Sequence, residues 1–168
     1  DSMPPFLGGG NMIADVRTEG FTCAELPAKF EAGTQAIVEV VGLGAAVDYL
    51  SGIGMANVRA HEHELTVHAL GALKSRFGDD IVIHGSTDAS VRGATISFAY
   101  RDVHPHDVSQ VLDQRNVCVR AGHHCAKPLM RLLGANATVR ASFYLYNTAA
   151  EADVLCDALA EAGDFFTL

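Results

Sequence analysis

The apolar residues of this 168-residue chain change their spacing near residue 80, and that change limits the folds it can adopt. Before residue 80 they recur at helical intervals. After it they gather in short runs typical of strands, at 81–84, 94–100, 116–120 and 138–143. Helical spacing returns over 107–112 and 149–162. Strands separated by helices indicate an α/β or α+β layer.

Two further helices are predicted before the change of spacing, over 38–50 and 57–77, with glycines interrupting the pattern between them. We place a domain boundary there, near Ser51. Residues 1–50 then form the tail of one domain, and residues 51–168 form a compact domain of ordinary size. Helix 149–162 has Thr148 as its predicted N-cap and Glu151 as the capping-box partner.

Cys125 is predicted to lie in a short loop between strand 116–120 and a helix that begins near Pro128. Gly122 ends the strand and allows the backbone to turn, and proline is favoured at a first helical position. Position alone does not distinguish a reactive thiol from a small buried apolar side chain. We expect the second role for Cys118, which falls inside the strand pattern.

Four potentially cationic side chains surround Cys125 in the sequence. Arg120 precedes it, His123 and His124 adjoin it, and Lys127 follows it. Cationic neighbours and a helix N-terminus favour the thiolate, which is the nucleophilic form of cysteine. The alternative, a closed zinc site, is disfavoured because no C-x-x-C or H-x-x-x-H pair supplies further ligands.

Composition narrows the possible partners. A formal net charge of −8 argues against nucleic-acid binding, which requires a basic patch. No apolar run is long enough to span a bilayer. Nearly half of the residues are hydrophobic and mean hydropathy is +0.17, so we expect an apolar surface that another chain or domain covers. Four cysteines without framework spacing favour the cytoplasm.

Thr34 precedes the predicted helix 38–50 in the stretch FEAGT. Its hydroxyl is placed to act as an N-cap, which would be a sufficient structural role. A helix N-terminus is also an anion site, so the same hydroxyl could bind phosphate. The sequence leaves both roles open. On the helix 57–77, His61 and His63 do not share a face and are expected to be solvated.

The string RAGHHCAKPLM resembles the active-site loop of the group II (SufS-type) cysteine desulfurases, pyridoxal-phosphate enzymes of the class V aminotransferase family. Other stretches resemble the same enzymes in the same order, namely PPFLGGGNMI, FEAGT, VGLGAAVDYL, VHPHDV, VRASFYLYNT and DFF. The resemblance implies the C-terminal part of such an enzyme. Residues 1–50 would belong to the cofactor domain, and 51–168 would form a small α+β domain with a short, mostly antiparallel sheet.

The resemblance also implies roles for individual residues. Cys125 would take sulfur from L-cysteine as a persulfide, with alanine released, and pass it to iron–sulfur cluster assembly. Arg140, with Arg120 as a second arginine, would bind the substrate carboxylate. Thr34 would contact the cofactor phosphate across a homodimer interface. His106 matches the histidine that exchanges a zinc ligand with a SufU-type acceptor, whereas a SufE-type acceptor would not need it.

One family feature is missing from the sequence. The enzymes attach pyridoxal phosphate to a lysine in an S-G-H-K-like segment, and the three lysines here, Lys29, Lys74 and Lys127, lie in other contexts. We therefore expect the isolated chain to be inactive on cysteine. Two alternatives stay open: a cofactor-free sulfur carrier that uses Cys125, and a dimerisation piece in which Cys125 is inert.

Overall fold

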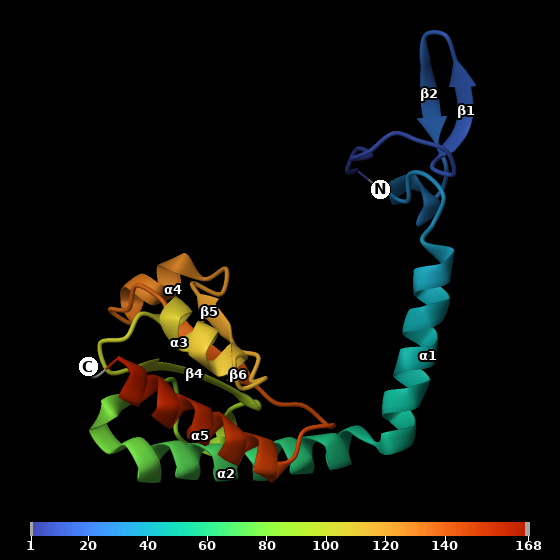
Figure 1. The fold of residues 1–168 in the computed structure, drawn as a ribbon. Coiled ribbons are helices and arrows are strands. Elements are labelled where there is room, and N and C mark those ends of the chain that lie inside the picture. The colour runs from blue at the N-terminus through green and yellow to red at the C-terminus, as the bar shows by residue number, and fades with distance from the viewer. Residues whose placement is uncertain (1, 167–168) are drawn as a thin grey trace. The chain divides into compact units, whose positions relative to one another are not determined.

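The computed structural model describes residues 2–166, and the chain divides into two compact units between Gly52 and Ile53. We describe each unit by itself. Figure 1 shows their elements in chain order.

The first unit contains an antiparallel hairpin, β1 (Ile13–Arg17) and β2 (Gly20–Cys23), that the sequence analysis did not predict. The glycine-rich stretch before it packs on the FEAGT segment. The Gly33 N–H donates to the Gly10 carbonyl at 2.7 Å. A Cβ placed on Gly9 would lie only 3.3 Å from the Gly33 nitrogen. The glycines therefore permit a close backbone contact within this unit.

Helix α1 (Ile37–Ile53) matches the predicted helix 38–50 but begins too late for Thr34 to cap it. Thr34 lies three residues before the helix, in a bend, with its side chain exposed. The N-cap prediction is therefore wrong. Apolar spacing marks the helical stretch but does not fix its first residue, and here the chain stays irregular through Gln35 and Ala36.

No residue of α1 is buried, although the helix is apolar on every side. Val38, Val41 and Leu43 are each at least 66% exposed. Such a helix is typical of the interior of a larger protein. It therefore supplies the apolar surface that the composition predicted.

The second unit is built on a four-stranded sheet in the order β3-β4-β6-β5, with every pairing antiparallel. The strands are β3 (Ile81–His84), β4 (Thr95–Tyr100), β5 (Arg120–Gly122) and β6 (Thr138–Ser142). The predicted fold class, helices packed on a short antiparallel sheet, is confirmed.

Strand β5 differs from the prediction, because it covers 120–122 rather than 116–120. Upstream of Arg120 the chain diverges from β6, and a hollow of about 260 Å³ opens between 117–119 and 141–143. Cys118 lies in this unpaired part and is exposed, so the prediction that it is a buried side chain is wrong. Alternating hydrophobicity indicates which side chains share a face, but it does not show where a partner strand ends.

One face of the sheet carries the core. Ile96, Phe98 and Tyr100 alternate along β4 and are fully or almost fully buried. They belong to one apolar cluster with Val139, Ala141 and residues of three helices. These helices are α2 (Met55–Phe77), α3 (Pro105–Asp113) and α5 (Ala149–Phe165). Figure 1 shows α5 running alongside α2.

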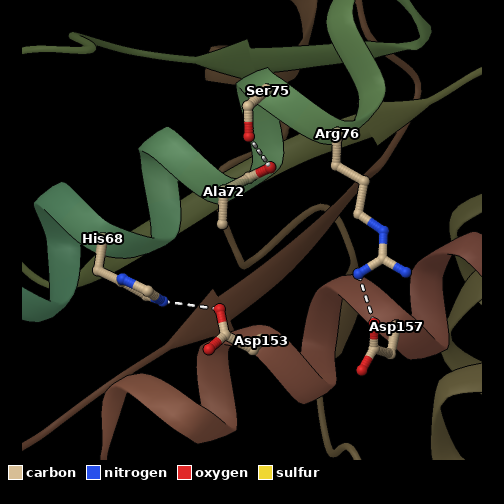
Figure 2. A network of polar contacts seen from close by, with 6 residues as sticks. All are labelled: His68, Ala72, Ser75, Arg76, Asp153 and Asp157. Atoms are coloured by element: carbon tan, nitrogen blue, oxygen red, sulfur yellow. Dashed lines mark hydrogen bonds and ion pairs between the residues drawn. The ribbon is translucent and has the colours of Figure 1, made fainter.

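An exposed hydrogen bond and an exposed ion pair also link α2 and α5, as Figure 2 shows. His68 Nε2 lies 2.7 Å from Asp153, and Arg76 pairs with Asp157. Such exposed pairs contribute at most about 1 kcal/mol each, so the apolar cluster holds the helices together. The predicted capping box of α5 is confirmed, because the Thr148 N–H donates to the Glu151 carboxylate at 2.7 Å.

His61 and His63 are half-buried rather than solvated. His61 Nε2 lies 2.9 Å from the Asn147 carbonyl, and His63 Nδ1 lies 3.2 Å from the Ala89 carbonyl. Both histidines therefore join α2 to loops of the second unit by hydrogen bonds. The prediction considered only which helix face each histidine lies on, and this does not show such contacts.

Among residues 2–166 no single helix is long and apolar enough to cross a membrane; α1 and α2 meet that test only as a bent pair.

Candidate functional site

Strands β5 and β6 bring the two candidate substrate-binding arginines together. Arg120 on β5 is the direct register partner of Arg140 on β6, and Ser97 on β4 is the next partner of Arg140. Directly opposed residues of antiparallel strands share a face of the sheet. The face away from the apolar cluster therefore carries both arginine side chains.

Cys125 follows in a tight turn between β5 and helix α4 (Lys127–Leu132), where Gly122 and Pro128 predicted a loop. His124 and Cys125 both have left-handed backbone conformations, with φ of 54° and 59°. Non-glycine residues adopt this region at a cost of about 1 kcal/mol or more each, and such residues concentrate at functional sites. The turn presents the Cys125 thiol to solvent.

The Cys125 thiol contacts one of the two arginines. Arg120 Nη2 lies 3.5 Å from Cys125 Sγ, within hydrogen-bonding range for sulfur. The Arg120 guanidinium therefore donates to the sulfur from the side of β5. The contact places a cationic side chain directly beside the candidate nucleophile.

An open hollow of about 530 Å³ surrounds Cys125, and His106 lies on its wall. His106 comes from the first turn of α3, where its N–H donates to His104 Nδ1 at 3.3 Å and the two rings stack. Lys127 and His123 also line the hollow. The structure thus brings together three residues that lie far apart or in separate motifs of the sequence, namely His106, Arg120 and Cys125.

The two histidines beside Cys125 differ in environment. His123 is exposed and lines the hollow. His124 is half-buried, and its Nε2 lies 2.8 Å from Thr138 Oγ1. Burial lowers the pKa of His124, and the nearby Arg140 and Arg120 charges lower it further. The His124 ring is therefore neutral near pH 7. Sequence reasoning missed Thr138, because only strand register places it near His124.

The residues fit the substrate side of a pyridoxal-phosphate site better than the cofactor side. The paired arginines and Cys125 suit the carboxylate and sulfur of an amino acid. In the first unit, the Thr34 hydroxyl is exposed on the segment against which the glycine loop packs, as a phosphate contact requires. Within residues 2–166, no group of three or more His, Cys, Asp or Glu side chains could hold a metal ion.

Comparison with known proteins identifies the family of the chain. Residues 1–155 match the aminotransferase class-V family model. A probable cysteine desulfurase of Streptomyces coelicolor is 52% identical over 99% of this chain, and a cysteine desulfurase of Haloferax volcanii is 48% identical over the same share. The chain spans only 39% and 38% of those two proteins.

Two solved structures resemble the chain closely. The cysteine desulfurase CsdA of Escherichia coli, in an S-sulfonic acid form, superposes with a TM-score of 0.88 at 34% identity. The apo cysteine desulfurase of Thermococcus onnurineus gives the same TM-score at 36% identity. The alignments cover 97% and 96% of this chain and 39% and 40% of those chains. The chain therefore belongs to the aminotransferase class-V family.

Proposed function

We propose that this chain forms the sulfur-accepting part of a pyridoxal-phosphate-dependent cysteine desulfurase. The observation that carries the proposal is Cys125, exposed on a turn, with its sulfur 3.5 Å from Arg120 and with Arg140 opposite Arg120 in the sheet. Relatives that match almost the whole chain are named as cysteine desulfurases. In this proposal residues 1–50 complete a cofactor domain, and residues 51–168 form the small domain.

The residues of the chain divide the work as follows. The planar guanidinium of Arg140 binds the α-carboxylate of L-cysteine through two hydrogen bonds. Arg120 holds the Cys125 sulfur by a hydrogen bond, and the Cys125 thiolate attacks the substrate sulfur. A sulfur–sulfur bond forms, the carbon–sulfur bond breaks and its electron pair stays with the carbon fragment, which gains a proton and leaves as L-alanine. Pyridoxal phosphate, when bound, supplies the electron sink that this cleavage needs.

The persulfide on Cys125 would then pass to an acceptor protein for iron–sulfur cluster assembly. The open hollow around the thiol and the placement of His106 on its wall support delivery at this face. A SufU-type acceptor with a zinc ion would use His106 as a replacement ligand, whereas a SufE-type acceptor would not. Thr34 would contact the cofactor phosphate across a homodimer interface, and the four cysteines favour the cytoplasm.

A second function, that of a sulfur carrier without a cofactor, fits the same exposed thiol. Such a carrier would need an exposed thiol beside a cation, and Cys125 meets that need. The two functions differ in the source of sulfur, because the carrier would accept it from another persulfide and would not release alanine.

Alanine formation by the complete enzyme tests the proposal. Cys125→Ser should abolish alanine formation from L-cysteine, whereas Cys118→Ser, at the other exposed thiol of the second unit, should leave it unchanged. Arg140→Gln should lower kcat/KM about 100-fold, because a charge-assisted pair is lost. Full alanine formation by Cys125→Ser would contradict the proposal. A cofactor-free Cys125 that still accepts sulfur from a persulfide would favour the carrier.

A further inference from the structure

We propose that His124 and Thr138 form a clasp that positions Cys125 against Arg120. Neither residue touches the Cys125 sulfur in the contacts described above, so both are positioning residues. The inference rests on the proposed role of Cys125 as the nucleophile.

Thr138 provides a fixed point for the clasp. It begins β6, its side chain is fully buried, and its register partner is Gly122 at the end of β5. Its Oγ1 lies 2.8 Å from His124 Nε2. The hydroxyl is therefore held by the sheet at the position where β5 ends and the Cys125 turn begins.

The clasp occupies the only ring nitrogen of His124 that has a hydrogen-bond partner among the described residues. His124 Nδ1 is buried and unpartnered there. The ring is thus turned toward the sheet, which leaves it without a contact through which it could act as a base for Cys125. Its lowered pKa keeps the ring neutral beside the cations Arg120 and Arg140. The side chain therefore anchors the turn without adding a third charge.

The turn needs an anchor because its backbone is strained. His124 and Cys125 are consecutive non-glycine residues with positive φ, a conformation that persists only where the surroundings impose it. The described backbone hydrogen bonds of the turn include Ala126 N–H to the His123 carbonyl at 2.9 Å, which closes the turn but does not join it to the sheet. When the clasp is lost, the turn can relax and Cys125 can leave Arg120.

Alkylation of Cys125 by iodoacetamide at pH 7 measures this positioning. The chain would carry Cys23→Ser and Cys118→Ser so that other accessible thiols do not react. Cys156 can stay, because burial raises its pKa to about 11. Thr138→Val keeps the shape of the buried side chain but removes the hydroxyl, and Thr138→Ser keeps the hydroxyl. We expect Thr138→Val to slow alkylation about fivefold, as loss of one hydrogen bond predicts, and Thr138→Ser to stay within about twofold.

His124 gives the reciprocal comparison and a second route should Thr138→Val fail to fold. His124→Gln keeps a polar group within reach of Thr138 Oγ1, so Cys125 should be alkylated at the parent rate. His124→Ala removes that group, so Cys125 should be alkylated more slowly than in the parent. The clasp acts through Arg120, so Arg120→Gln combined with Thr138→Val should react no more slowly than Arg120→Gln alone. A purely structural role would predict neither rescue by glutamine nor this non-additivity.

Two results would overturn the inference, and they are distinguishable. A fast parent rate that both Thr138→Val and His124→Ala leave unchanged would remove the clasp alone. A parent rate equal to that of a free cysteine peptide would remove the proposed nucleophile and the positioning role with it.

Discussion

Arg120 and Arg140 lie directly opposite one another on β5 and β6, and Arg120 also reaches Cys125 Sγ at 3.5 Å. Like charges at opposed positions destabilise a sheet, so this arrangement has a cost in the free protein. A bound carboxylate and a thiolate would offset it.

Replacing Arg120 by Gln should therefore stabilise the fold while it impairs Cys125. Removal of the repulsion is worth about 0.5 kcal/mol, which corresponds to a rise in Tm of about 2 °C for a unit of this size. Calorimetry and iodoacetamide alkylation measure the two effects. Arg131→Gln, at an exposed position on α4, is the control and should change neither quantity in this way. A lower Tm for Arg120→Gln would contradict the repulsion.

Stability should decline as the pH falls below about 6.5. Burial lowers the pKa of His84 and of His124, so the folded chain resists protonation at pH values where the unfolded chain already accepts protons. The unfolded state then binds more protons than the folded state. The free energy of unfolding therefore decreases as the pH decreases. His84→Leu removes a buried, unpartnered Nε2 and should lose less stability between pH 7 and pH 5.5 than the parent. If the urea-unfolding midpoints of the parent and of His84→Leu decreased equally over this range, His84 would not be a source of the pH dependence.

Two helical glycines should respond oppositely to substitution by alanine. A Cβ on Gly163 in α5 would lie 2.3 Å from the hydroxyl of the buried Tyr100, whereas a Cβ on Gly71 in α2 meets nothing within 4 Å. Gly71→Ala should therefore gain up to about 1 kcal/mol of helix propensity. Gly163→Ala should lose about 1–3 kcal/mol through overpacking, more than it gains in propensity. If urea unfolding showed the same gain in the free energy of unfolding for both variants, Tyr100 would have moved aside without destabilising the fold.

Local patterns predicted most elements of the second unit, because period and capping act within a few residues. Strands β3 and β4 and helix α5 begin within one residue of their predicted starts. The errors came where partners decide the structure. Strand β5 differs from its predicted range because the alternation of its own residues does not show where its pairing with β6 ends. Thr34 is not an N-cap because α1 begins at Ile37.

The candidate site likewise has a part that the sequence predicts and a part that depends on how the strands pair. Residue types and resemblance predict Cys125, Arg120, Arg140 and His106 as candidate site residues. The opposition of the arginines and the His124–Thr138 clasp depend on the register between β5 and β6, which the sequence does not specify. The grouping of His106 with Cys125 depends on how α3 packs beside the sheet.

Mass spectrometry of the complete enzyme after one turnover with sulfur-34-labelled L-cysteine tests the central claim most directly. The account predicts one additional labelled sulfur on the peptide that contains Cys125, removable by a thiol reductant and matched by one alanine released. Labelled sulfur on Cys118 instead, or alanine release with no sulfur on Cys125, would contradict it.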